Sequence, residues 1–327
     1  MRQRVAAPPG MVRSPQVAWT VRAGGPVTLP LTVGFTGVWV VAAGEVLLVQ
    51  HDGSVGMRAA LDASTPVSPM EPEPLVGTSG GSLRGFSPDT GRVTLSWPGS
   101  GRARSAAIPV EGGAIWTASD GTVHSTIHGP IARLPSTAGE LAGDGGRAFI
   151  QTQDNLLAAV DARGPAWRAP LPGRGVGSPL VCCDRVFVAY DGGDEPSGVL
   201  ALDPGSGAIA WQAELASAPS AGMALAGDRL LIPQIDGSLE ALSVSGGSPL
   251  WSVRAGPDRL SVPPLVAGES AWIGDAAGRL HRVDLSDGGI AWSMDLGSPI
   301  TSGPELAWDL MLIGLASGDV LALRAPG

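Results

Sequence analysis

Three segments of this chain repeat one another without gaps, and this repeat constrains the fold more than any other feature. They are LALDPGSGAIAW (200–211), EALSVSGGSPLW (240–251) and HRVDLSDGGIAW (281–292). In each, a glycine lies four residues before the tryptophan, and an Asp or Ser lies eight before it. The Asp or Ser side chain can bond the backbone of a turn, and glycine accepts a positive φ at little steric cost. The spacing therefore predicts a β-hairpin whose second strand places the tryptophan on its buried face.

The repeat extends, in weaker form, along most of the chain. Another β-rich stretch precedes each hairpin, and similar pairs of strands are expected at 37–49, 74–86, 113–125 and 147–160. Each unit then has four antiparallel strands, as in a propeller blade. The tryptophan slot is filled by Trp19, Met57, Leu95, a poorly marked position near Leu134, Trp167, Trp211, Trp251 and Trp292, which are 39 residues apart on average. Eight slots predict an all-β, eight-bladed β-propeller, and no window has the 3.6-residue period of a helix.

The two ends of the chain complement each other. The segment PQVAWTVRAG (15–24) is a tryptophan strand with no strands before it, and LASGDVLALRAPG (315–327) contains a third strand with no tryptophan strand after it. We therefore expect residues 16–23 to form the outermost strand of the blade supplied by 299–324. This pairing closes the propeller and removes an open sheet edge.

Charge and hydropathy limit the classes of function. The net charge of −9 argues against a nucleic-acid-binding surface, which needs a basic footprint. Residues 1–110 hold nine arginines against six acids, whereas 111–327 hold twelve against twenty-four, an asymmetry that can mark a partner-facing side. No apolar stretch reaches the roughly 18 residues of a membrane span.

The N-terminal residues set the expected domain limits and location. Residues 1–14 carry three arginines and no acid, and they lack the apolar run of a secretory signal. We expect a flexible basic tail over 1–14 and a single propeller domain over 15–327. The expected location is the cytoplasm for the sequence as numbered, and the periplasm or the exterior if the N-terminus is truncated.

The pattern A-L-D-x-x-[TS]-G-x-x-x-W at Ala201–Trp211 resembles the repeat of the quinoprotein (PQQ-type) propellers. The resemblance covers residues 15–325 and is strongest over 175–325. That family has one branch of quinoprotein dehydrogenases and another of binding propellers, such as the lipoprotein of the outer-membrane barrel-assembly machinery. A compact chain with eight blades is closest in size to the second, non-catalytic branch.

Cys182 and Cys183 are the strongest indication of an enzyme, because the resemblance implies an adjacent-cysteine disulfide near the cofactor of the dehydrogenases. Here the pair is expected at the end of a first strand, just before a hairpin turn. The Ca²⁺ ligands and Asp base of those enzymes have no counterpart that we find in the sequence. We expect no catalytic residue and no cofactor, and whether the two cysteines form a vicinal disulfide stays open.

The other candidate sites are carboxylates, histidines and one serine. Asp191, Asp194 and Glu195 lie in the long loop DGGDEPSG and could hold Ca²⁺, although a solvated acidic loop is the simpler interpretation. His124 and His128 are about 13 Å apart on an extended strand, too far for one metal ion, and His51 and His281 are isolated in the sequence. Ser79 lies in a G-x-S-x-G string, but that motif needs a strand-to-helix turn. We expect no metal site.

These observations favour a scaffold over an enzyme. We expect a non-catalytic propeller that binds another protein or protein complex, as a subunit or accessory factor of a larger bacterial assembly. By itself it is expected to be monomeric, without bound nucleic acid. The alternatives are a degenerate quinoprotein-type enzyme and a small-ligand or sugar-binding sensor module that uses the central channel.

Overall fold

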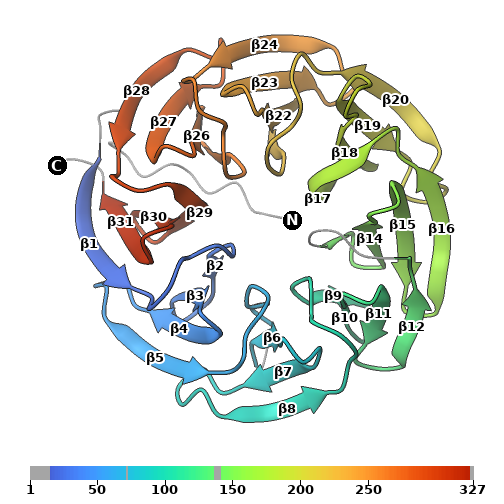
Figure 1. Cartoon of the computed structure of the whole chain (residues 1–327), viewed down its shortest axis with the longest axis vertical. Coiled ribbons are helices and arrows are strands. Elements are labelled where there is room, and N and C mark those ends of the chain that lie inside the picture. Colours follow the sequence, from blue (N-terminus) through green and yellow to red (C-terminus); the bar gives the residue numbers. More distant parts are fainter. Residues whose placement is uncertain (1–14, 71–72, 136–140, 325–327) are drawn as a thin grey trace. The chain divides into compact units, whose positions relative to one another are not determined.

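The computed structural model describes residues 15–70, 73–135 and 141–324, and within them it contains strands and no helix. The 31 strands of these residues form eight antiparallel sheets, the blades of the predicted eight-bladed β-propeller (Figure 1). Seven sheets have four strands. The sheet β6–β8 has three, and an isolated bridge between Ser68 and Leu75 stands in the place of its first strand. The expected all-β fold class is confirmed.

The chain divides into two compact units, one comprising residues 1–43, 48–56 and 217–327 and the other residues 44–47 and 57–216. Three sheets lie entirely within the first unit. In the order of their pairing they are β1 (Gln16–Arg22), β31 (Asp319–Arg324), β30 (Leu310–Leu315) and β29 (Ile300–Ala307); β21 (Ala224–Ala226), β22 (Arg229–Pro233), β23 (Ser238–Ser243) and β24 (Pro249–Arg254); and β25 (Leu265–Ala267), β26 (Ser270–Gly274), β27 (Arg279–Asp284) and β28 (Ile290–Asp295).

Four sheets lie entirely within the second unit. They are β6 (Leu75–Gly77), β7 (Leu83–Phe86) and β8 (Val93–Trp97); β9 (Ile108–Val110), β10 (Gly113–Thr117), β11 (Thr122–Ser125) and β12 (Gly129–Arg133); β13 (Ala142–Gly143), β14 (Arg147–Gln151), β15 (Leu156–Asp161) and β16 (Gly164–Pro170); and β17 (Arg174–Cys182), β18 (Arg185–Asp191), β19 (Gly198–Leu202) and β20 (Ile209–Glu214). The remaining sheet has the order β2 (Thr32–Val33), β3 (Val38–Ala42), β4 (Glu45–Val49) and β5 (Val55–Ala60).

The hairpin turns of the repeat form as their residue types predict. Asp203 Oδ1 accepts hydrogen bonds from the backbone N–H groups of Gly205 and Ser206, at 3.0 and 2.8 Å. The hydrogen bond from the Ser206 hydroxyl, at 2.8 Å, and the one from the Ser206 backbone N–H hold the pKa of the Asp203 carboxyl below its ordinary value. Gly207 closes the turn with φ +74°, and Asp284 bonds the backbone N–H of Ser286 in the same way. The spacing of Asp and Gly in the sequence therefore correctly predicts the geometry of these turns.

The slot side chains pack between neighbouring sheets, as expected. The Trp167 indole donates to the Pro204 carbonyl at 2.9 Å, and the Trp251 indole donates to the Leu285 carbonyl at 3.1 Å. Each ring therefore lies over the hairpin turn of the next blade. The sequence predicts that Trp211, Trp251 and Trp292 are buried, but in the structure all three are only half-buried. Among the described residues, the buried tryptophans are Trp39, Trp116 and Trp272, each on the second strand of its sheet.

A β-bulge precedes the slot in each sheet whose outer pairing is described. Trp211 pairs with Ala201 and Ile209 with Leu202, so one residue of β20 is passed over. In the sheet β9–β12 the equivalent register pairs Val123 with Ala132. Ala132, and not the nearby Leu134, therefore fills the fourth slot. Because this slot holds alanine and not a large apolar residue, the repeat is hard to recognise in the sequence of this blade.

The two ends of the repeat pair as predicted. β1 runs antiparallel to β31, with Gln16 opposite Arg324 and Arg22 opposite Asp319. Figure 1 shows the blue strand β1 beside the red strand β31. The Trp19 indole donates to the His51 carbonyl at 2.9 Å, as other slot tryptophans do to the turns beside them. Closure by the N-terminal strand is confirmed.

The core lies between adjacent sheets. In the first unit, buried Trp272 and Leu280 of β26–β27 pack in one cluster with Met311 and Leu323 of β30–β31. In the second unit, Ile115 and Val123 of the sheet β9–β12 share a cluster with residues of β14–β15. The strands that supply these side chains are buried on both faces, which explains their continuous apolar runs. The predicted flexible tail, 1–14, lies outside the described residues, and the single domain over 15–327 stays a prediction.

Candidate functional site

The two cysteines lie on an exposed turn. β17 ends at Cys182, which pairs with Arg185 at the start of β18, so Cys183 and Asp184 form a two-residue hairpin turn. Both turn residues have a positive φ, 53° and 55°, the geometry of a type I′ turn. Both thiols are free, with Cys182 half-buried and Cys183 exposed. The expected position before a hairpin turn is confirmed, and the disulfide implied by the resemblance is not formed.

Burial and the neighbouring thiol both act on Cys182. Its partial burial disfavours the thiolate, and interaction with the Cys183 thiol adds to this, which together raise the pKa of Cys182 to about 12. Such a dithiol can hold a soft ligand through both sulfurs.

The acidic loop between β18 and β19 uses its first carboxylate to hold its own structure. Asp191 lies 3.3 Å from the Arg174 guanidinium and also accepts from the Gly193 backbone N–H at 3.0 Å. Asp194 and Glu195 are exposed. Within the described ranges, no three His, Cys, Asp or Glu residues are grouped so that they could hold a metal ion. A Ca²⁺ site at this loop therefore gains no support from the geometry, and its absence stays a prediction.

His124 and His128 are not brought together. His124 is buried on β11, where its ring stacks on Trp116 with centroids 4.9 Å apart. That burial lowers the pKa of His124, and the charge of Asp120 opposes the shift. His128 is exposed in the turn after β11. The first histidine therefore belongs to the packing of its sheet and the second to the surface.

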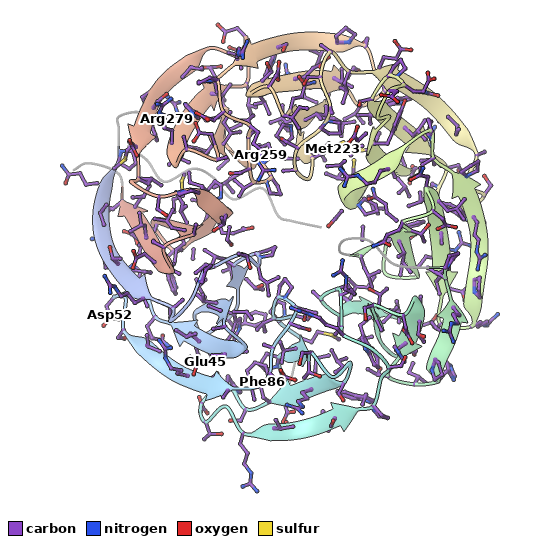
Figure 2. All side chains as sticks on the ribbon, viewed as in Figure 1. Glu45, Asp52, Phe86, Met223, Arg259 and Arg279 are labelled. Carbon is purple, nitrogen blue, oxygen red and sulfur yellow. The ribbon has the colours of Figure 1, made fainter. Side chains whose placement is uncertain are left out.

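His281 is the centre of a buried polar group that the sequence analysis missed. Its Nδ1 lies 2.7 Å from the Ser293 hydroxyl, and its Nε2 lies 3.4 Å from Asp275 Oδ2. Asp275 Oδ1 accepts from the backbone N–H groups of Ala277 and Arg279, and Figure 2 shows Arg279 at the start of β27. The residue types are those of a Ser–His–Asp hydrolase.

The neighbouring sheet shows how that group belongs to the repeat. Gln234 occupies the turn position of Asp275, and its amide donates to Glu240, the counterpart of His281, at 2.7 Å. Both Glu240 and His281 lie opposite a serine on the outer strand. The same contact is thus made with residues that cannot form a catalytic triad. Aligning QIDGSLE (234–240) with DAAGRLH (275–281) by their turns was the signal that could have paired these positions.

The exposed His51 also has partners that the sequence did not reveal. Its Nε2 lies 2.7 Å from Asp309 Oδ1, and Arg324 Nε lies 3.1 Å from the other carboxylate oxygen of Asp309. The hydrogen bond from His51 is the main cause that lowers the pKa of Asp309. The His51 ring meets Trp308 edge-on, with centroids 5.2 Å apart. His51 and His281, which are isolated in the sequence, therefore each have polar partners in the fold.

Trp308 is an unusual residue at this surface. It has φ +57° and is 44% exposed, although bulky residues rarely adopt the left-handed conformation. Phe35 lies in the corresponding turn of the sheet β2–β5, between the first two strands, and is 85% exposed. Asp52, in the same turn as His51, is labelled in Figure 2. We use the name aromatic turn surface for two sets of exposed turn residues, the contacting group His51, Trp308 and Asp309 and the separate Phe35.

Ser79 behaves as the hairpin residue that was expected. It lies in the turn between β6 and β7, and its hydroxyl donates to Asp62 Oδ1 at 2.6 Å. The strand that follows is β7, and not the helix that a nucleophile elbow requires.

Comparison with known proteins was made by sequence and by structure. The family described as outer membrane protein assembly factor BamB matches residues 99–197 and 195–327. The protein of that name from Bordetella pertussis is 25% identical over 86% of this chain and 68% of its own length. The one from Salmonella typhimurium is 29% identical over 45% of this chain and 36% of its own length.

Two solved structures share the fold. BamB from Moraxella catarrhalis superposes with a TM-score of 0.77 at 18% identity, over 95% of this chain and 98% of that chain. The computationally designed protein Ika8 superposes with a TM-score of 0.82 at 13% identity, over 94% of this chain and 99% of its own. At such identities the two structures support the fold alone.

The expected cytoplasmic location is wrong. The relatives are named as assembly factors of outer membrane proteins, and the outer membrane lies outside the cytoplasm. The expectation rested on the composition of residues 1–14, which does not report the compartment. Among the described residues, no helix is long and apolar enough to cross a membrane.

The match over 99–327, the repeat and the superposed propeller agree with one another. The relatives are named as assembly factors and not as enzymes. The resemblance to the PQQ-type repeat is thereby confirmed for the branch of binding propellers. This chain belongs to the family of the outer membrane protein assembly factor BamB.

Proposed function

We propose that this protein is a non-catalytic propeller that binds other proteins during the assembly of outer membrane proteins. The observation that carries the proposal is the family match over residues 99–327. The repeat explains the buried polar pairs as structural contacts, since Gln234–Glu240 takes the place of Asp275–His281. We propose no chemical reaction for it, and no cofactor.

The aromatic turn surface is the part of the molecule best suited to bind such a partner. Aromatic side chains are enriched where protein interfaces have their strongest contacts. Phe35 and Trp308 are both exposed, and Asp309 is held between His51 and Arg324. A partner with an apolar segment could bury the two rings and leave the charged groups at the rim.

The test is complementation in the native bacterium. Loss of the gene should lower the amount of folded outer membrane proteins, and the wild-type gene should restore it. The variant Phe35→Ser/Trp308→Ser should reach normal levels of folded protein but restore assembly poorly. Ile209→Ser is the matched control, since Ile209 is a similarly exposed apolar residue on an outer strand. Unchanged outer membrane proteins after gene loss would contradict the proposed function.

The proposal includes a monomer with no affinity for nucleic acid. A net charge of −9 opposes binding to a phosphate backbone. Size-exclusion chromatography with light scattering, with and without DNA, tests both points. A stable dimer or a DNA complex at physiological salt would contradict this part.

A further inference from the structure

We propose that Cys182 and Cys183 form a two-sulfur binding site for a soft monovalent metal ion of the Cu(I) class. The site goes beyond the proposed assembly function and does not depend on it. It lies on the turn between β17 and β18.

The turn presents both sulfurs from a fixed backbone. Cys182 is held in the ladder by pairing with Arg185, and Cys183 and Asp184 complete the turn with φ 53° and 55°. A left-handed cysteine is costly, and such strain persists where the surrounding structure imposes it. The exposed Cys183 gives an ion access, while Cys182 is half-buried. Both thiols therefore belong to one short turn, and we propose that they bind one ion together.

The number of available ligands selects the class of ion. Soft thiolates favour Cu(I), Zn²⁺ and iron–sulfur clusters. Structural Zn²⁺ needs four ligands and iron–sulfur clusters are held by several cysteines, whereas the chain has two cysteines. Nowhere in the described ranges do three metal-binding side chains gather. Cu(I) is the ion of this group whose coordination two sulfurs can complete.

The charges at the turn neither add to nor oppose the charge of the proposed complex. Binding exchanges one Cu(I) for the two thiol protons, so the dithiolate complex carries one negative charge. Arg185 lies opposite Cys182, and its guanidinium donates to the Asp184 carbonyl at 2.7 Å. It therefore places a positive charge at the turn, where the carboxylate of Asp184 supplies a negative one, so the turn residues themselves add no net charge.

The experiment is an anaerobic titration of the reduced full-length protein with Cu(I), in competition with the chelator bathocuproine disulfonate. The wild type should retain one Cu(I) per chain. Cys182→Ser and Cys183→Ser should each weaken binding at least about tenfold. Asp184→Asn is the matched control, because Asn also tolerates the left-handed conformation and both thiols remain. It should bind as the wild type does, and circular dichroism checks that each variant is folded.

Three results would overturn the proposal. Retention of Cu(I) by Cys182→Ser/Cys183→Ser would show that the ion binds elsewhere. One ion per two chains, with a dimer in light scattering, would show a site between molecules. Equally tight binding of Zn²⁺ at one ion per chain would show that the class of ion is wrong.

Discussion

Two features of the structure favour glycine at position 288, the conformation of its turn and the closeness of Trp251. Its φ is +79°, which side chains rarely adopt, and a Cβ placed on it would lie 2.7 Å from the Trp251 ring. The turn glycine of one sheet thus makes room for the slot tryptophan of the preceding sheet. The same close approach occurs beneath other slot side chains, at Gly53 with Trp19, Gly91 with Met57 and Gly207 with Trp167.

Replacing Gly288 should therefore destabilise the fold, whereas replacing the nearby Gly246 should not. We expect Gly288→Ala to lower the free energy of unfolding by about 1–3 kcal/mol, because the left-handed conformation and the contact with Trp251 both penalise a Cβ. Gly246→Ala is the control, since a Cβ there meets no atom within 4 Å and its φ is not positive. Urea unfolding at neutral pH measures both. Equal losses in the two variants would contradict the packing described for the slot.

The burial of His281 should make stability depend on pH. Burial lowers its pKa below 6.5, while hydrogen bonding and charge from Asp275 oppose the shift and the charge of Arg279 adds to it. Near pH 6.5 the unfolded histidine gains a proton, whereas the folded one gains it only at lower pH. The contribution of neutral His281 to the free energy of unfolding is therefore fully present above pH 6.5. It is lost as the pH falls below this value, by up to about 1.4 kcal/mol per pH unit.

Chemical unfolding between pH 7.5 and 5.5 tests this expectation. His281→Gln should lose part of the slope seen in the wild type. His128→Gln is the control and should keep the slope, because His128 is exposed. A wild-type slope that His281→Gln leaves unchanged would assign the pH dependence to other groups, such as the buried His124.

At the scale of elements, the outer strand of each blade combines a hairpin turn, a bulge and a slot residue. The bulge lies between Ala201 and Leu202 in one sheet and between Arg282 and Val283 in another. It shifts the register of the outer strand so that the slot side chain reaches the next sheet. β1 supplies these same features to the sheet of β29–β31, from the opposite end of the sequence.

Deleting residues 1–24 should therefore remove an essential element. The deletion exposes the edge of β31 and removes Trp19, which packs on Gly53. We expect a loss of several kcal/mol, against a total stability typically of about 5–15 kcal/mol. Deleting residues 1–13 is the control, because it leaves β1 whole. Equal melting temperatures for the longer deletion and the full-length chain would contradict this role of β1.

At the scale of the whole molecule, the pairing of β1 with β31 makes the starting point of the repeat arbitrary. Arg324 lies opposite Gln16, the arrangement that a hairpin turn connects in the other sheets. A chain that begins in a different blade should therefore reach the same fold. Exposed loop tips tolerate new ends best, and Asp194 and Glu195 lie on such a loop.

A circular permutant tests this expectation. Arg324 is joined to Gln16 by a turn of the length of 285–289, and the new ends lie between Asp194 and Glu195. We expect the native circular dichroism spectrum and a stability within about 1 kcal/mol of the wild type. A permutant opened at Ile313, inside the buried strand β30, is the control and should not fold. Failure of both would contradict the interchangeability of the blades.

The sequence by itself determined the strands, the turns, the blade number and the pairing of the chain ends. These features depend on local spacing, because Asp203, Gly207 and Trp211 lie within a single hairpin. The tertiary structure alone decided which distant side chains meet. The contacts of His51 with Asp309, and Ala132 in place of Leu134 at the fourth slot, depend on register, bulges and packing between strands. The repeat shows which positions of different blades are equivalent. It does not show which side chains of neighbouring strands touch, or how a bulge shifts the register.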